Sequence, residues 1–222
     1  MTSRSILTIS GLTCAGKDHL ARKLTEDCRV TKVISTTTRN PREGEVQGQS
    51  YYFTSREQFN ERVRAGRFIE SIELKGELYG IDVNALRPAF YAGDTALIIC
   101  DPRGMESVRD YAEQSGVDFH SVFLDIDFEQ QTRRLFERFC ADTNADPGVY
   151  ASRMCHIIQE EHHWRDYNYD SRFDSFDPET GPLVIEQVQR VVALMQNRAD
   201  WEPILACAKD PSPKESKGLS VG

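Results

Sequence analysis

The stretch GLTCAGKD at residues 11–18 decides the fold of this 222-residue chain. It follows a short apolar run at residues 6–10, which predicts a strand, and it precedes a segment to about Glu26 with helical periodicity. Glycines in this context let backbone N–H groups converge on phosphate oxygens at a helix N-terminus, and Lys17 reaches the β- and γ-phosphates. The pattern therefore predicts a nucleotide-binding phosphate loop, called the P-loop below.

The position after Lys17 departs from the usual P-loop pattern, because it holds Asp18 where a Ser or Thr hydroxyl normally contacts Mg²⁺. A carboxylate oxygen is also a hard ligand, so Asp18 could bind Mg²⁺ directly or through water. A negative charge in the first turn also stabilises a helix through its macrodipole. The sequence leaves both roles open.

A second group of phosphate- and base-binding residues begins at the stretch ISTTTRNPREGE, residues 34–45. Arg39 and Arg42 lie three residues apart, and Tyr51, Glu70 and Tyr79 follow. Guanidinium groups bind phosphate through paired hydrogen bonds, and an ionised carboxylate accepts from base N–H groups. This group suits a nucleoside monophosphate, so the chain is predicted to bring two nucleotides together.

Strands that alternate with helices predict an α/β fold with a parallel sheet covered on both faces. Apolar runs at 95–100 and 121–125 are typical of strands buried on both sides. Further strands are predicted at 30–38, 51–54, 68–74 and 78–83, and helices at 56–65, 84–91, 105–115, 128–139, 149–167 and 183–195. The segment 35–90 is the exception to the alternation, and we expect a small inserted β-rich subdomain there.

Composition narrows the class of protein. The 39% hydrophobic and 28% charged residues fit a soluble globular protein, and no apolar run approaches the ~20 residues that span a bilayer. A net charge of -8 argues against non-specific binding to nucleic acid. The six cysteines form no C-x-x-C pair, which indicates free thiols in a reducing cytoplasm. Residues 208–222 are polar, contain two prolines and are predicted to be disordered.

Over about residues 5–195 the chain resembles the guanylate kinase family. The resemblance rests on the P-loop, on STTTRNPREGEVQG at 35–48 with Tyr51, on FIE at 68–70 and on YG at 79–80. It implies a P-loop NTPase-type sheet, a monophosphate-binding subdomain and a helical lid, with ATP and Mg²⁺ as cofactors. It also implies that the acceptor nucleotide contacts Ser35, Arg39, Arg42, Tyr51, Glu70, Tyr79, Ile81 and Asp101.

The same resemblance assigns the donor side. ATP phosphates would be held by Gly11, Thr13, Cys14, Ala15, Gly16, Lys17, Asp18, His19 and Arg134. Arg138 and Arg153 resemble lid arginines that, with Lys17, stabilise charge on the transferred phosphoryl group. Arg134 and Arg138 are four residues apart and so share one helix face. A surface ion pair between Arg134 and Glu137 is the alternative for Arg134.

Two positions differ from the family pattern. Ile81 replaces the usual Ser or Thr after Tyr-Gly, whose hydroxyl helps to hold the 6-oxo group of guanine, and Ile99 replaces an aspartate near the metal. An unpartnered buried carbonyl costs about 1–3 kcal/mol. Guanine would therefore bind weakly, or the natural base would be modified at position 6. Asp18 is a hypothetical substitute for the missing metal-side carboxylate.

The sequence predicts one domain over 1–200, with a core (1–34, 91–133 and 168–198), a monophosphate-binding subdomain (35–90) and a lid (134–167). The expected function is a cytoplasmic, monomeric or homodimeric kinase for (d)GMP or a related purine nucleotide, without nucleic-acid or membrane partners. Alternatives are a ribose 1,5-bisphosphate phosphokinase-like enzyme, which shares Gly-Lys-Asp, and a non-catalytic protein-binding domain of the same fold.

Overall fold

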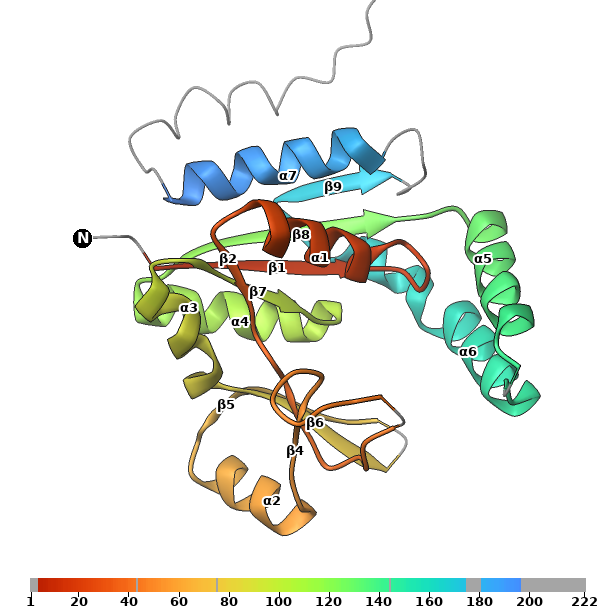
Figure 1. Cartoon of the computed structure of the whole chain (residues 1–222), viewed down its shortest axis with the longest axis horizontal. Coiled ribbons are helices and arrows are strands. Elements are labelled where there is room, and N and C mark those ends of the chain that lie inside the picture. Colours follow the sequence, from red (N-terminus) through yellow and green to blue (C-terminus); the bar gives the residue numbers. More distant parts are fainter. Residues whose placement is uncertain (1–3, 43, 75, 144, 175–180, 197–222) are drawn as a thin grey trace, which may run out of the picture.

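A five-stranded parallel sheet forms the centre of the molecule (Figure 1). The computed structural model describes residues 4–42, 44–74, 76–143, 145–174 and 181–196. The strand order is β2-β7-β1-β8-β9, and every pairing is parallel. The strands are β1 (Ser5–Gly11), β2 (Val30–Lys32), β7 (Thr95–Ile99), β8 (Asp118–Asp125) and β9 (Ser171–Asp174).

Helices cover both faces of this sheet, as the alternating pattern predicts. Helices α1 (Lys17–Asp27) and α7 (Gly181–Gln196) lie on one face, and α3 (Arg87–Ala92) and α4 (Pro102–Ser115) lie on the other (Figure 1). Side chains alternate along β1, so that Leu7 packs in the cluster under α1 and α7, whereas Ile6 packs in the cluster under α3 and α4. The predicted α/β fold class is confirmed.

A smaller mixed sheet lies beside the core, at the bottom of Figure 1, with the order β4-β3-β6-β5. Its strands are β3 (Thr36–Thr37), β4 (Tyr52–Phe53), β5 (Phe68–Leu74) and β6 (Glu77–Asp82), and a 3₁₀ turn, η1 (Val83–Leu86), leads from β6 into α3. Helix α2 (Arg56–Arg64) begins where the hydroxyl of Ser55 accepts the N–H of Gln58 at 3.2 Å. Helix α4 packs against β5 and so joins the two sheets.

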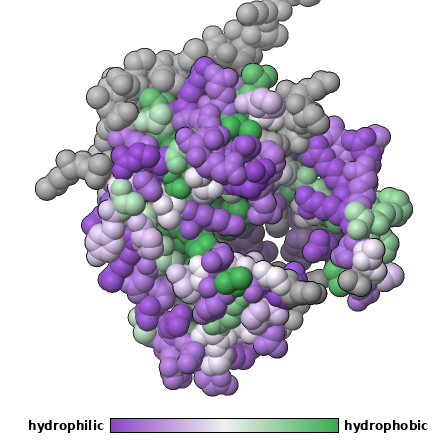
Figure 2. Space-filling view, in the orientation of Figure 1, coloured by the Kyte–Doolittle hydropathy of each residue, from purple (hydrophilic) through white to green (hydrophobic). Residues whose placement is uncertain are grey.

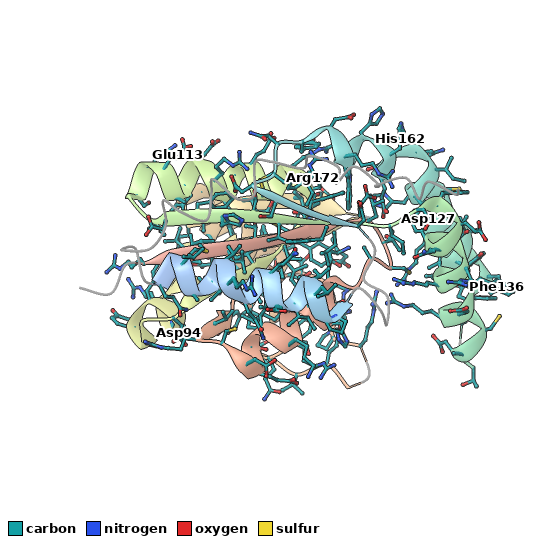
Figure 3. The ribbon with its side chains drawn as sticks, turned by 90° about the horizontal axis from the view of Figure 1, so that it is seen from above. Asp94, Glu113, Asp127, Phe136, His162 and Arg172 are labelled. Atoms are coloured by element: carbon teal, nitrogen blue, oxygen red, sulfur yellow. The ribbon has the colours of Figure 1, made fainter. Side chains whose placement is uncertain are left out.

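A helical unit, called the lid below after its predicted role, consists of α5 (Phe128–Ala141), α6 (Pro147–Gln159) and the 3₁₀ turn η2 (Glu161–Asp166). It lies at the end of the core sheet where β1 stops (Figure 1). Asp127 and Asp146 cap α5 and α6 with their side chains, accepting from Gln130 and Gly148 at 2.8 and 2.7 Å. Asp127 marks the start of α5 in Figure 3, and Phe136 lies further along this helix, with half of its surface exposed.

Two sequence predictions of secondary structure need correction, and one strand was missed. The single strand predicted at 30–38 is wrong, because β2 belongs to the core sheet and β3 to the small sheet. The continuous helix predicted at 149–167 is wrong beyond Gln159, where α6 ends and η2 follows. Strand β9 was not predicted, because its residues alternate between exposed and half-buried and form no apolar run.

Two further sequence expectations concern the ends and surface of the chain. The tail at 208–222 lies outside the described residues. Within the described ranges, none of the helices is both long and apolar enough to cross a membrane. The face shown in Figure 2 is mostly hydrophilic, with isolated apolar side chains.

Candidate active site

The P-loop leaves the end of β1 and turns tightly into α1. A Cβ atom on Gly11 would lie 2.4 Å from the carbonyl oxygen of Leu124 on β8, so only glycine fits this position. Gly16 is left-handed, with φ of 95°, directly before α1. Cys14 also has a positive φ of 66°, which is uncommon for a residue with a side chain. Two residues of the loop before Lys17, Cys14 and Gly16, thus have left-handed backbone conformations.

Lys17 is held against the loop that precedes it. Its Nζ atom donates to the carbonyl oxygens of Gly11 and Leu12 at 2.7 and 2.9 Å. Burial lowers the pKa of Lys17, and the negative charges of Glu161 and Asp18 act in the opposite direction. The ammonium group therefore lies against the first two carbonyl oxygens of the P-loop.

Glu161 on η2 is a carboxylate that sequence reasoning missed. It is only 1% exposed and accepts from the backbone N–H of Thr13 at 2.7 Å and from the amide of Gln131 at 2.6 Å. The Thr13 hydroxyl donates to its other oxygen. The run EEHH at 160–163 gives no sign of this burial, because four polar residues in a row are typical of a solvated surface.

A cavity of about 820 Å³ opens between the P-loop, α5 and the start of α7. Its lining includes Cys14, Gly16, His19, Arg134, Arg138 and Pro182. The Nη1 atom of Arg134 donates to the Cys14 carbonyl at 3.2 Å, so this arginine points toward the P-loop. The surface pair with Glu137 is therefore not the arrangement that the structure adopts. The cavity places the lid cations beside the P-loop.

A second cavity of about 390 Å³ lies between α5 and α6, and Arg42 from the loop after β3 also lines it. Arg42, Arg138 and Arg153 line it, which brings arginines from three separate segments together. Arg138 lines both cavities, so it lies between the cavity beside the P-loop and the cavity that Arg42 reaches. Figure 2 shows a recess between the lid and the body of the molecule.

Arg39 on the small sheet is already engaged by its own loop. Its Nη2 atom donates to both carboxylate oxygens of Glu45 at 2.8 and 2.9 Å, and its Nη1 donates to the Asn40 carbonyl at 2.7 Å. The guanidinium carbon lies 5.5 Å from the ring centre of Tyr51, which meets Tyr79 edge-on at 6.1 Å. A phosphate bound at Arg39 would either share the guanidinium group with Glu45 or displace Glu45 from it.

The carboxylate of Glu70 on β5 lies against the first turn of α4. A Cβ on Gly104 would be 2.3 Å from Glu70 Oε2, so the glycine makes room for the acid. Asp101 caps α4 by accepting from the Gly104 N–H at 2.8 Å. Burial, and then the nearby charge of Asp101, raise the pKa of Glu70 to about 7. Sequence reasoning identified Glu70 and Asp101 but missed Gly104, whose role depends on packing between the two sheets.

The remaining base-pocket candidates lie nearby. Ile81 pairs across the strands with Glu70 and is buried in the cluster that also holds Val33 and Ile98. Ser35 lies just before β3, where its carbonyl accepts the N–H of Tyr52 at 2.8 Å. Ile81 therefore presents an apolar side chain next to the acid.

Asp18 is exposed in the first turn of α1, beside Lys17. No group of three or more His, Cys, Asp or Glu side chains with metal-binding geometry occurs among the described residues. Ile99 packs against the core cluster on the α1 side of the sheet. Mg²⁺ commonly binds through one or two carboxylates together with substrate phosphates and water, and Asp18 fits a site of that kind.

The fold and the site together define a P-loop phosphotransferase. A P-loop at the end of the first strand, arginines on the helices beside it and a cluster of arginines, tyrosines and an acid on a separate sheet are the parts expected for joining a donor and an acceptor. The guanylate kinase family model matches residues 3–177.

Individual relatives agree with this match. The guanylate kinase of Cereibacter sphaeroides is 32% identical over 202 residues, covering 90% of each chain. That of Pseudomonas fluorescens is 32% identical over 197 residues, covering 87% of this chain and 90% of the relative. The crystal structure of guanylate kinase from Anaplasma phagocytophilum has the same fold, with a TM-score of 0.63 at 23% identity over 96% of this chain and 98% of that one.

The chain belongs to the guanylate kinase family. It is accordingly an ATP-dependent nucleoside monophosphate kinase.

Proposed function

We propose that the chain transfers the γ-phosphoryl group of ATP to GMP, dGMP or a close purine analogue changed at position 6. The acceptor phosphate attacks the γ-phosphorus in line, and the bond from that phosphorus to the β,γ-bridging oxygen breaks. The nucleophile is already anionic, so no protein base is needed. Positioning and charge neutralisation account for most of the catalysis in such reactions.

On the donor side, the P-loop backbone and Lys17 would hold the ATP phosphates. Arg134 reaches the same loop through the Cys14 carbonyl, so it is suited to contact the donor nucleotide. Arg138 lines both cavities, which suits it to the charge that develops between donor and acceptor. Arg153 shares the second cavity with Arg42 and would act on the same group.

On the acceptor side, Arg39, Arg42, Tyr51 and Tyr79 would hold the monophosphate. Arg42 lines the cavity with the lid arginines, whereas Arg39 is braced by Glu45. We propose that Glu45 orients Arg39 so that its remaining edge faces the phosphate. Guanidinium forks suit this task because they bind phosphate through parallel hydrogen bonds.

The observation that carries the proposed substrate is the position of Glu70. Its carboxylate is partly buried beside Asp101, in space that only a glycine at position 104 leaves open. An ionised carboxylate accepts the N1–H and 2-amino hydrogens of guanine, whereas adenine N1 is itself an acceptor. Sites that depend on such hydrogen bonds reject mismatched analogues by on the order of 10⁴-fold.

The apolar side chain of Ile81 bears on which substituent at position 6 of the purine the site would accept. Ile81 is 1% exposed and lies opposite Glu70 across the strand pair. It offers no donor to a 6-oxo group, so a purine with a 2-amino group and another substituent at position 6 is the second candidate substrate. Ribose 1,5-bisphosphate carries no base and would leave Glu70 without a partner.

ADP release with a panel of monophosphates tests this proposal. The panel contains GMP, dGMP, dAMP, the 2,6-diaminopurine deoxynucleotide and ribose 1,5-bisphosphate. We expect turnover of GMP and dGMP and at least 100-fold lower kcat/KM with dAMP. The 2,6-diaminopurine nucleotide keeps the 2-amino donor, but its N1 is an acceptor like that of adenine, so its turnover would require the protonated form of Glu70. Turnover of ribose 1,5-bisphosphate alone, or no turnover of any acceptor by the folded protein, would contradict the proposal.

Other expectations remain predictions. We propose that Mg²⁺ is held by the ATP phosphates, water and Asp18, and an unchanged Mg²⁺ dependence of turnover in Asp18→Ala would contradict that role. A single domain over 1–200 with core, monophosphate-binding and lid parts, a cytoplasmic location and a monomeric or homodimeric state also await tests.

A further inference from the structure

Glu161 is buried beside the P-loop although it belongs to a strongly polar segment. It is 1% exposed, yet its carboxylate meets donors from two other parts of the chain. One oxygen accepts from the Thr13 N–H at 2.7 Å and from the Gln131 amide at 2.6 Å. The other accepts the Thr13 hydroxyl and lies 3.7 Å from Nε2 of His156. A buried carboxylate is costly unless it is hydrogen-bonded, and this one is well supplied with donors.

These donors lie on the segments that must act together during phosphoryl transfer. Thr13 is in the P-loop, Gln131 is on α5 and His156 is on α6, while Glu161 itself begins η2. Next to this network, Cys14 packs in a small apolar cluster with Leu135 and Ile157. The P-loop and the lid helices therefore meet through this polar network, through the Arg134–Cys14 hydrogen bond and through an apolar cluster.

We propose that Glu161 is a positioning residue, which fixes the P-loop in its phosphate-binding shape and ties that shape to the lid helices. It acts through Thr13 and does not itself reach the phosphates. The inference rests on the phosphotransferase activity of the family and does not depend on which purine is the acceptor.

The position of Thr13 in the loop explains how such an anchor would work. The preceding residue, Leu12, accepts Lys17 Nζ at 2.9 Å and the Ala15 N–H at 3.1 Å through its carbonyl oxygen. The following residue, Cys14, has φ of 66°. The Thr13 N–H and the Leu12 carbonyl that accepts from Lys17 belong to the same peptide group, and Thr13 directly precedes the left-handed residue Cys14. Holding Thr13 by its N–H and its hydroxyl therefore fixes both the orientation of Lys17 and the entry into the left-handed turn.

A simpler interpretation is that Glu161 only attaches η2 to the body of the protein. A different ion pair already makes such an attachment, because Arg165 on η2 contacts Asp125 at the end of β8 through Nε at 2.8 Å and Nη2 at 2.6 Å. Arg165 hydrogen-bonds to Asp125 and to the Ile126 carbonyl, whereas Glu161 accepts two hydrogen bonds from Thr13 in the P-loop. Substitution of Arg165 therefore tests the attachment of η2, whereas substitution of Glu161 also tests the effect on the P-loop.

The test compares Glu161→Gln with Glu160→Gln, which makes the same charge change at an exposed neighbour. Affinity for a non-hydrolysable ATP analogue is measured by calorimetry, so that the readout does not depend on the acceptor. KM for ATP, KM for GMP, kcat and Tm are measured in parallel, and Arg165→Met serves as the control for attachment of η2.

We expect Glu161→Gln to weaken binding of the analogue and to raise KM for ATP by about tenfold, because one oxygen that accepts from the P-loop is replaced by a donor. KM for GMP should stay within about twofold, and Glu160→Gln should match the wild type. Arg165→Met should lower Tm without a selective effect on ATP. Equal changes in both KM values, or the same ATP effect in Arg165→Met, would overturn the proposal.

A double-mutant cycle covers the case in which Glu161→Gln folds poorly. Thr13→Ala keeps the backbone contact and removes only the hydroxyl. If Glu161 acts through Thr13, the effect of Glu161→Gln on ATP affinity should be about threefold smaller in the Thr13→Ala background than in the wild type. Independent effects that multiply would overturn the proposal, and Thr13→Ala alone with unchanged ATP affinity would also count against it.

Discussion

Glu161 and Glu70 are two poorly exposed carboxylates beside the two nucleotide sites, and their surroundings differ. Glu161 accepts hydrogen bonds from Thr13 and Gln131 within the protein. No group among the described residues donates a hydrogen bond to Glu70, and the charge that adds to burial in raising its pKa is that of another acid, Asp101. One carboxylate is satisfied by the fold, and the other lacks a donor.

This difference indicates different tasks. A carboxylate that already accepts three hydrogen bonds from the protein holds structure in place and has little capacity left for a ligand. A partly buried carboxylate without protein donors costs stability, and such cost is typical of groups kept for binding or catalysis. The following predictions test this contrast between Glu161 at the P-loop and Glu70 at the base pocket.

The largest expected effect is that of Glu70→Gln on the acceptor. Loss of two hydrogen bonds to a charged group, each worth about 1.5–3 kcal/mol, should lower kcat/KM for GMP by about 10³-fold. ATP affinity should not change, because Glu70 lies on the small sheet, away from the P-loop. Steady-state kinetics with each substrate varied in turn measure both values. A parallel loss of ATP affinity would mean that the two carboxylates do not have separate tasks.

Gly104→Ala should have the next largest effect. The added Cβ would lie 2.3 Å from Glu70 Oε2, so the carboxylate must move. We expect KM for GMP to rise by about 10- to 100-fold with little change in KM for ATP, on the scale of one or two lost hydrogen bonds. Gly116→Ala is a poor control because φ there is +62°, so Ser115→Ala in the same helix is preferable. An unchanged KM for GMP would show that Glu70 does not contact the base.

The pH dependence of acceptor binding should be smaller. The pKa of Glu70 is raised to about 7 by burial and by Asp101, and only the ionised form accepts the guanine hydrogens. KM for GMP should therefore be flat above about pH 8 and should rise by about tenfold near pH 6 as Glu70 takes up a proton. Glu70→Gln should abolish this dependence, and KM for ATP over the same range is the control.

The same raised pKa predicts an effect on stability. The folded protein holds the Glu70 proton more tightly than the unfolded chain, so the free energy of unfolding should fall as the pH rises from about 4.5 to about 7. Glu70→Gln removes this penalty and should be more stable than the wild type at pH 8 by about 1–3 kcal/mol. Denaturant unfolding at pH 5 and pH 8 measures the difference, which should be much smaller at pH 5.

The smallest effect is expected at Ile81. Ile81→Thr keeps the branched shape and adds a hydroxyl beside the base pocket, at some cost in stability because the residue is buried. Guanine should gain about fivefold in kcat/KM relative to the 2,6-diaminopurine nucleotide, since one extra hydrogen bond contributes about 1 kcal/mol. An unaltered preference between the two purines would place Ile81 outside the base pocket.

Much of the fold could be predicted from the sequence, because its signals are local. The glycines and Lys17 of the P-loop lie within eight consecutive residues, and Ser55 caps α2 through a residue three positions later. Arg39 and Glu70 were identified by resemblance to family motifs. Such features depend on neighbouring residues or on short patterns, which a single sequence contains.

Features that depend on tertiary contacts could not be predicted. Glu161 looks like a surface residue in EEHH, and only the packing of η2 against the P-loop buries it. Gly104 looks like an ordinary helical glycine until β5 brings Glu70 against it. Residues 30–38 have a uniform β-branched pattern, and nothing local shows that the chain passes from one sheet to the other near Val33.

The proposed base pocket is divided between the small sheet and the core, and this has a consequence for how the enzyme would fail on heating. Glu70 is supplied by the small sheet, whereas Asp101 and Gly104 belong to the core, so recognition of the base requires the two parts to be docked in register. The P-loop needs only the core and the lid. Mild warming that loosens the docking should thus leave an enzyme that still binds ATP but no longer distinguishes one purine from another. Selectivity for the base would be lost at a lower temperature than ATP binding.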